Sequence, residues 1–249
     1  MNFLNKRKEK LSYILDLPKK GSNFPGIILC HGFAKAKSDK KFVQLSKALT
    51  KQGIAVFRFD FSGHGFSEGS IENLDIVFQA EEIKSAYDVF LQNKKINKKK
   101  IIILGHSLGA LSVVLFQLKY KLAKGLILVS PALCQKELIK KWYTKQEIYL
   151  WRKQEFLETK KGRLGIKYLN QALLKDWQNT ASRIKIPVLL IHGKKDEDIP
   201  VKYTKNLFSK LNCEKTLKII ESAEHHFKNK QSRDKLIKIV VDWISLAMA

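Results

Sequence analysis

The chain has 249 residues, 45% of them apolar, which is enough for one large hydrophobic core and predicts a single domain over residues 1–249. Its 47 basic and 23 acidic residues give a formal charge of +24 at pH 7. The lysines are scattered, without interleaved aromatic residues or a nucleic-acid-binding motif, so a nucleic-acid or anionic-surface binder is the less favoured alternative.

Apolar runs alternate with amphipathic stretches, which predicts an α/β fold: a mostly parallel central sheet with helices on both faces. The apolar runs predict strands at Gly26–Cys30, Ile54–Phe59, Ile101–Leu104, Gly125–Val129, Val188–Ile191 and Thr216–Ile220. Leu11–Leu17 is expected to add an antiparallel edge strand. The amphipathic stretches predict helices at Lys40–Lys51, Leu74–Gln92, Ser107–Tyr120, Val201–Leu211 and Ser232–Ala247.

Residues 131–183 interrupt this alternation. They contain no convincing strand and are rich in aromatic and basic residues. An insertion of this length is too long for an ordinary connection between strands. We therefore expect a small helical cap, inserted into the single domain and lying over the carboxyl ends of the strands, where open α/β sheets bind ligands.

A pentapeptide, Gly105-His106-Ser107-Leu108-Gly109, lies between a predicted strand and a predicted helix. A G-x-S-x-G sequence in this context predicts a nucleophile elbow, a strained turn that exposes the hydroxyl of its serine. Ser107 is therefore the predicted nucleophile. The backbone N–H of Leu108, at the start of the helix, is predicted to stabilise an oxyanion formed beside Ser107.

Two earlier loops are expected to support this turn. His31-Gly32-Phe33 follows the strand Gly26–Cys30, and the backbone N–H of Phe33 is the predicted second donor to the oxyanion. His31 is expected to brace its loop by hydrogen bonds. In the run from Asp60 to Ser67, the side chains of Asp60, Ser62 and His64 are expected to brace a second loop beside the site.

A serine hydroxyl needs a base within hydrogen-bond reach and a carboxylate to orient that base. Asp196, the first acid after the strand Val188–Ile191, is the predicted carboxylate, with Glu197 and Asp198 as alternatives. The loop after the last strand holds two adjacent histidines. His225 is the predicted base, and His226 remains the alternative.

The chain resembles the α/β-hydrolase superfamily, and within it capped bacterial cinnamoyl (feruloyl) esterases and serine-aminopeptidase-like hydrolases. The resemblance rests on motifs in family order: His-Gly-Phe, Asp-Phe-x-Gly-His-Gly-x-Ser, Gly-His-Ser-Leu-Gly, His-Gly-x-x-Asp-x-x-Ile-Pro and Ala-x-His-x-Phe. It implies a catalytic triad of Ser107, Asp196 and His225, with the amides of Phe33 and Leu108 as the oxyanion hole.

These features predict a serine esterase that cleaves small-molecule carboxylic esters through an acyl-enzyme, and the resemblance implies that it is of cinnamoyl or feruloyl type. A thioesterase, a monoacylglycerol lipase or a peptidase would use the same residues and remains an alternative. No sequence cluster of metal ligands is present, so neither a metal nor a cofactor is expected.

The sequence also bears on location. No apolar run approaches the ~18–20 residues of a membrane span, and the charged N-terminus lacks the apolar segment of a secretory signal. The cysteines Cys30, Cys134 and Cys213 are too widely spaced for a disulfide framework or a metal knuckle. A cytoplasmic protein is expected. The oligomeric state is left open, a homodimer included.

Overall fold

A mixed, largely parallel sheet forms the centre of the molecule. The computed structural model describes residues 1–248. Within them the main sheet has eight strands, in the spatial order β1 (Asn2–Leu4), β2 (Lys10–Asp16), β4 (Ala55–Phe59), β3 (Phe24–Cys30), β5 (Ile96–His106), β6 (Gly125–Val129), β9 (Val188–Gly193) and β10 (Lys215–Ile220). The six strands from β4 to β10 in this order run parallel to one another. The predicted α/β class is confirmed.

The predicted antiparallel edge strand is antiparallel but does not form the edge. β2 pairs with β4 on one side and with β1 on the other, so that Phe3 faces Leu11. β1 has three residues, too few to show an alternation of apolar and polar side chains in the sequence. One buried aromatic side chain packs it against the rest of the sheet. The ring centroid of Phe3 lies 6.1 Å from that of Phe57 and 5.9 Å from that of Phe59.

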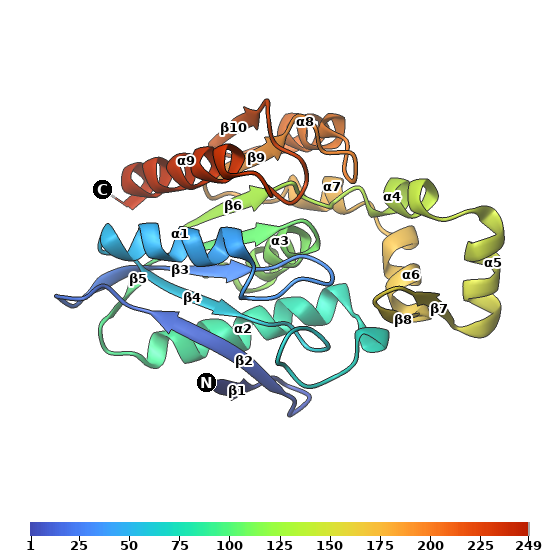
Figure 1. Cartoon of the computed structure of the whole chain (residues 1–249), viewed down its shortest axis with the longest axis horizontal. Helices are drawn as coiled ribbons and strands as arrows, with labels where there is room; N and C mark the ends of the chain where they lie inside the picture. Colours follow the sequence, from blue (N-terminus) through green and yellow to red (C-terminus); the bar gives the residue numbers. More distant parts are fainter. Residues whose placement is uncertain (249) are drawn as a thin grey trace.

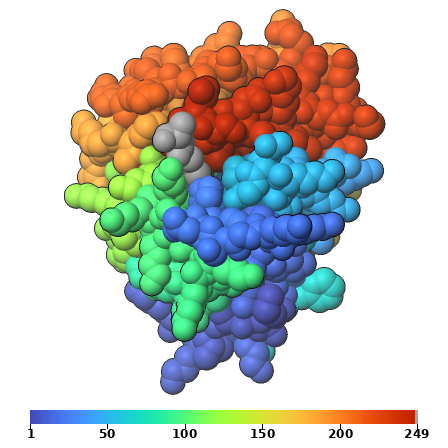
Figure 2. Space-filling view, turned by 90° about the vertical axis from the view of Figure 1, so that its left-hand side faces the viewer, coloured from blue at the N-terminus to red at the C-terminus, as the bar shows by residue number. Residues whose placement is uncertain are grey.

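Helices cover both faces of the sheet because alternate side chains of each buried strand point to opposite sides. Ile27 and Leu29 of β3 pack in the core beneath α1 and α9, and Ile28 and Cys30 pack in the other core layer. One face is covered by α1 (Lys40–Lys51) and α9 (Lys230–Met248), and the other by α2 (Ile76–Gln92), α3 (Leu108–Tyr120) and α8 (Val201–Lys210). Figure 1 shows these layers, and Figure 2 shows α9 in red beside α1 at one end of the molecule.

The 131–183 segment lies at the end of the sheet toward which the parallel strands point (Figure 1). It contains α4 (Gln135–Trp142), α5 (Lys145–Gln154), β7 (Phe156–Thr159), β8 (Gly162–Gly165), α6 (Ile166–Leu174) and α7 (Trp177–Ala181). Its own core is built around Trp151, which is fully buried between the rings of Tyr143 and Tyr168.

The antiparallel hairpin of β7 and β8 differs from the sequence expectation, which placed no strand in this segment. Each strand has only four residues, and the pair is stabilised by contacts with the 3₁₀ helix η1 (Ile71–Asn73) of the main body. A Cβ atom on Gly165 would lie 2.4 Å from the carbonyl oxygen of Glu72, so the hairpin depends on this close tertiary contact.

Polar contacts fasten the segment to the start of α2. Gln171 accepts a hydrogen bond from the N–H of Ile76 and donates one to Asp75, both at 2.8 Å. The ammonium of Lys167 lies 2.7 Å from the same carboxylate. These contacts to the buried Asp75 and Ile76 therefore help to fix the position of the segment above the strand ends. Among residues 1–248, no helix combines the length and apolar character that a membrane crossing requires.

Candidate active site

The turn between β5 and α3 holds Ser107 in an unusual backbone conformation. Its φ is 56° and its ψ is −120°, a combination that residues other than glycine rarely adopt. Both flanking glycines are required by close contacts: a Cβ on Gly105 would lie 2.5 Å from Cα of Ala110, and one on Gly109 would lie 2.3 Å from the carbonyl oxygen of His31. The strand and the helix can therefore approach closely enough to form the sharp turn.

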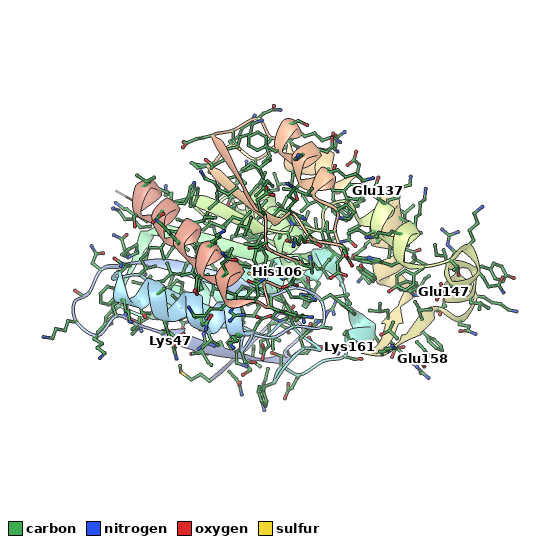
Figure 3. The ribbon with its side chains drawn as sticks, turned by 45° about the horizontal axis from the view of Figure 1, so that its top comes forward. Lys47, His106, Glu137, Glu147, Glu158 and Lys161 are labelled. Carbon is green, nitrogen blue, oxygen red and sulfur yellow. The ribbon has the colours of Figure 1, made fainter. Side chains whose placement is uncertain are left out.

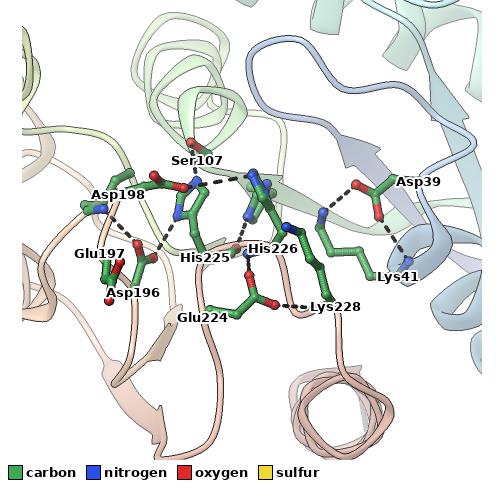
Figure 4. Close-up of polar contacts among 12 residues, drawn as sticks. Asp39, Lys41, Ser107, Asp196, Glu197, Asp198, Glu224, His225, His226 and Lys228 are labelled. Atoms are coloured by element: carbon green, nitrogen blue, oxygen red, sulfur yellow. Dashed lines mark hydrogen bonds and ion pairs between the residues drawn. The ribbon is translucent and has the colours of Figure 1, made fainter. Parts of the chain in front are cut away.

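Ser107, His225 and Asp196 form a continuous hydrogen-bonded chain (Figure 4). Oγ of Ser107 lies 3.1 Å from Nε2 of His225, and Nδ1 of His225 lies 2.7 Å from Oδ2 of Asp196. The loops that carry them follow β5, β9 and β10. The parallel sheet therefore brings His225 next to Ser107, from which it is separated by 118 positions in the sequence, and next to Asp196, from which it is separated by 29. An imidazole held between a carboxylate and a hydroxyl can accept the proton of that hydroxyl.

The carboxylate of Asp196 is buried and fully engaged. Oδ1 accepts a hydrogen bond of 2.7 Å from the N–H of Ile199, and Oδ2 faces both His225 and Nε2 of His192, the latter at 3.2 Å. Burial raises the pKa of Asp196, but the hydrogen bonds from His192 and His225 outweigh that effect and hold the pKa well below its usual range. Asp196 is therefore ionised at neutral pH.

His192, to which the sequence pattern assigned no role, supports Asp196 from the end of β9. Its Nε2–H also donates to the carbonyl oxygen of Ile199 at 2.8 Å, and its Nδ1 accepts a hydrogen bond of 2.7 Å from the hydroxyl of Thr204. These contacts fix the tautomer and the orientation of the ring. The feature of the sequence that could have pointed to His192 is its polar side chain at the end of an otherwise apolar buried strand.

The alternative residues lie beside the hydrogen-bonded chain rather than in it. In the described part of the molecule, neither Glu197 nor Asp198 forms a side-chain hydrogen bond with His225, and Asp198 lies 3.9 Å from Nε2 of His226. His226 forms no hydrogen bond with Ser107 there. Burial and the neighbouring His225 lower the pKa of His226 to about 4. The structure thus brings the preferred acid and the preferred histidine together with Ser107.

Phe33 and Leu108, whose backbone amides are predicted to form an oxyanion hole, line the same cavity as Ser107. Within residues 1–248, neither the N–H of Phe33 nor that of Leu108 donates a hydrogen bond to another protein group. Gly32 lets the Phe33 loop approach the elbow, since a Cβ at this position would lie 2.9 Å from Cβ of Ser107. Two unpaired amides beside a nucleophile are suited to bind a developing negative charge.

Buried polar contacts brace the Phe33 loop. Nε2 of His31 accepts a hydrogen bond of 3.0 Å from the N–H of Phe61, and Nδ1 donates to the carbonyl oxygen of Gly32 at 2.8 Å. Burial, together with the nearby His64, lowers the pKa of His31 to about 3, so the ring stays neutral. Asp60 is fully buried and accepts hydrogen bonds from the backbone and side chain of Lys37 and from the N–H of Phe66.

His106 inside the pentapeptide holds the loop of the candidate base. Its Nε2–H donates to the carbonyl oxygen of His225 at 2.9 Å. Burial lowers the pKa of His106 well below its ordinary value. A neutral, buried ring therefore links the nucleophile elbow directly to the loop after β10, a role that the bare motif does not reveal.

A cavity of about 320 Å³ opens at the hydroxyl of Ser107. Its floor comes from the main body and its walls from the 131–183 segment, through Tyr143, Leu164 and Tyr168. The hydroxyl of Tyr168 donates a hydrogen bond of 2.9 Å to Gln135, which also lines the cavity. The site is thus a pocket with a mostly apolar and partly aromatic surface, edged by charged side chains, which suits a small organic ligand.

Two groups of side chains in the described residues have ligand atoms close enough to share a metal ion: His106 with His225 and His226, and Asp196 with Asp198 and His225. Both groups include His225. Its two ring nitrogens already form the hydrogen bonds to Asp196 and Ser107, so a metal ion in either group would compete with those bonds.

Comparisons with known proteins agree with the observed fold. The family model for serine aminopeptidase, S33, matches residues 23–161 and 143–231. Over the whole chain, the structure is similar to Est1E of Butyrivibrio proteoclasticus with bound ferulic acid, with a TM-score of 0.87, 23% identity and 99% of that chain covered.

Curated relatives include esterase EstD of Thermotoga maritima, 25% identical over 229 residues that span 83% of this chain and 55% of that protein. An uncharacterised 31.7 kDa protein of Escherichia coli is 30% identical over 105 residues, 42% of this chain and 36% of its own. The chain thus spans about a third to a half of these relatives' length. The match to the family model, together with the sheet and the elbow, shows that the chain belongs to the serine aminopeptidase S33 family of the α/β-hydrolase superfamily.

Proposed function

We propose that this chain is a serine esterase that hydrolyses carboxylic esters through an acyl-enzyme on Ser107. The observation that carries the proposal is the pair of hydrogen bonds, 3.1 Å and 2.7 Å long, that connect Ser107 through His225 to Asp196 at the mouth of an apolar cavity. In this proposal Ser107 is the nucleophile, His225 is the general base, and Asp196 orients the imidazole.

In the first step Oγ of Ser107 attacks the carbonyl carbon of the ester while its proton passes to Nε2 of His225. The resulting tetrahedral oxyanion accepts hydrogen bonds from the N–H groups of Phe33 and Leu108. Collapse of this intermediate breaks the bond between the carbonyl carbon and the alkoxy oxygen. The protonated His225 gives its proton to that oxygen, and the alcohol leaves.

In the second step a water molecule attacks the acyl-enzyme, and His225 takes one of its protons. The second tetrahedral intermediate collapses, the carboxylic acid is released, and Oγ of Ser107 regains a proton from His225. Ionised Asp196 stabilises the imidazolium that forms in each half of the reaction. Each amide of the oxyanion hole is expected to supply about 3–4 kcal/mol of transition-state stabilisation.

An aromatic acyl group of cinnamoyl or feruloyl type is the proposed substrate class. Two observations support it: the cavity is lined by aromatic side chains from the 131–183 segment, and the fold is similar to that of an Est1E structure that holds ferulic acid. In this proposal residues 131–183 are a cap, inserted into one domain over residues 1–249, that sets substrate choice. Thioesters, monoacylglycerols and peptides would engage the same triad and differ in fit to this cavity.

The proposal is tested by labelling the purified protein with a fluorophosphonate and mapping the modified peptide. Ser107 should carry the label, and Ser107→Ala should lower ester turnover by roughly 10⁴-fold or more while the circular dichroism spectrum stays unchanged. Ser209→Ala, an exposed serine on α8, is the matched control. Label on another residue, or undiminished turnover in Ser107→Ala, would disprove the mechanism.

A substrate panel then tests the proposed acyl group. Methyl ferulate and methyl cinnamate should give a higher kcat/KM than a palmitoyl thioester, a monoacylglycerol and an aminoacyl anilide. A preference for one of the other classes would leave the triad in place and reject the cinnamoyl assignment.

A further inference from the structure

A second, more open cavity of about 410 Å³ adjoins the cavity at Ser107. Ala34, Lys35 and Lys161 line both of them, so the two cavities are neighbours at these residues. The second cavity is lined by the loop after β3 and by the His64 loop. A molecule bound at Ser107 that extends past Lys35 and Lys161 would enter this outer cavity.

The two lysines at the junction come from different parts of the fold. Lys35 belongs to the loop that carries Phe33, and Lys161 belongs to the turn between β7 and β8 (Figure 3). In residues 1–248 neither ammonium group has an ion pair or a hydrogen-bond partner. Many other lysines near acids in this chain are paired, as Lys37 is with Asp60. Two unpaired cations therefore lie where the two cavities adjoin.

The acidic side chains that line the two cavities neutralise only part of this charge. Among the described lining residues these acids are Asp39 and Asp198. Asp39 caps α1 and is already bound by the ammonium of Lys41 at 2.7 Å. Asp198 lies 3.9 Å from His226, whose pKa is lowered to about 4, so Asp198 keeps its negative charge at neutral pH. Two lysines against one unpaired acid leave a net positive charge close to the scissile bond of a bound ester.

We propose that Lys35 and Lys161 form a subsite for a carboxylate or phosphate group on the alcohol part of the ester. The inference rests on the proposed function, in which the aromatic acyl part lies among Tyr143, Leu164 and Tyr168. The second cavity then remains for the alcohol. The preferred substrate class is an aryl-acyl ester whose leaving alcohol carries an anion.

The chemistry of the two side chains sets the kind of selectivity. A lysine ammonium is a compact point charge on a flexible stem, so it recognises negative charge without the bidentate geometry of arginine. Lys161 is exposed, so the attraction should weaken as salt is added. We therefore expect a preference for anionic esters that is large at low salt and decreases at high salt.

The test compares three cinnamoyl esters that differ only in the para substituent of the phenol: carboxylate, phosphate, and neutral carboxamide. At low salt, kcat/KM for at least one anionic ester should exceed that of the carboxamide at least fivefold. The better of the two anionic esters shows whether the subsite prefers a carboxylate or a phosphate. In Lys35→Gln/Lys161→Gln this ratio should fall below twofold. Lys160→Gln, on the same turn but outside both cavities, should retain it.

Binding of the same compounds to Ser107→Ala, measured by calorimetry, needs no turnover and separates the two proposals. The anionic ester should bind at least fivefold more tightly than the carboxamide, and the double lysine substitution should remove that difference. A smaller preference, or one that survives the double substitution, overturns the subsite. Loss of Ser107 labelling or of hydrolysis of the carboxamide ester would instead count against the proposed esterase.

Discussion

Nε2 of His192 lies 3.2 Å from Oδ2 of Asp196, the same oxygen that accepts the hydrogen bond from His225. The carboxylate therefore has a second imidazole partner that never approaches the hydroxyl of Ser107. This contact lowers the pKa of Asp196 and limits the directions in which the carboxylate can turn.

Substitution His192→Leu should impair catalysis without touching the reacting atoms. Without this donor the carboxylate of Asp196 can turn, so it holds the imidazole of His225 less firmly for proton transfer. We expect kcat to fall about tenfold while KM stays within about twofold. His192→Gln, which keeps an N–H donor, should restore part of kcat; an unchanged kcat in His192→Leu would contradict a positioning role.

Substitution Asp196→Asn should lower kcat by about 10⁴-fold, because an amide in this position favours the wrong tautomer of His225. Glu197→Gln is the matched control, since this exposed side chain has no contact with His225 in the described residues. Asp198→Asn should cost far less than Asp196→Asn. Steady-state kinetics on a 4-nitrophenyl ester measure all three, and equal losses at 196 and 198 would refute the assignment.

The two adjacent histidines should differ in their effect on kcat. His225→Ala should remove most of kcat, by about 10³-fold or more, because His225 is the ring bonded to Oγ of Ser107. His226 has a pKa lowered to about 4, so it is already neutral from pH 5 upward. His226→Ala should therefore change KM through the lost cavity wall but leave the pH dependence of kcat between pH 5 and 8 unchanged. A loss of kcat in His226→Ala as large as that in His225→Ala would make His226 the base.

Glu82 should make stability depend on pH near neutrality. This fully buried carboxyl accepts hydrogen bonds from Asn5 and from the N–H of Ser62, yet burial raises its pKa to about 7. Because the folded pKa exceeds 4.5, the ordinary value of a glutamate side chain, the folded state keeps the proton to a higher pH than the unfolded state does. Stability from this group is therefore present below pH 4.5 and lost as pH rises to about 7, by roughly 3 kcal/mol.

Denaturant unfolding of the wild type and Glu82→Gln at a series of pH values measures this effect. The free-energy difference between them should shift in favour of Glu82→Gln as pH rises from 4.5 to 8. Glu81→Gln is a matched control: burial raises the pKa of Glu81, but hydrogen bonds from Lys119 and Lys6 bring it down to about 2. Its stabilisation is complete above pH 4.5, so its difference from wild type should stay constant over that range. A constant difference for Glu82→Gln would show that Glu82 is ionised throughout.

Local patterns were sufficient to predict the α/β fold. Strands such as β6 and helices such as α1 have the same bounds in the sequence prediction and in the structure, because a buried parallel strand needs a continuous apolar run and a surface helix needs an apolar stripe. The short elements β1, β7 and β8 carry no such pattern. Each depends on a contact made far along the chain, as Phe3 does with Phe57 and Gly165 with Glu72.

For the candidate site, local sequence was enough to predict which residue types follow which strand: a serine between glycines after β5, acids after β9 and adjacent histidines after β10. Parallel strands all end at one edge of the sheet, so these loops had to meet. The packing of the folded chain selects which acid and which histidine come within hydrogen-bond reach of Ser107, and it adds His192, His106 and the unpaired Lys35 and Lys161. Distance and direction between distant loops depend on how the whole chain packs, and no local pattern encodes them.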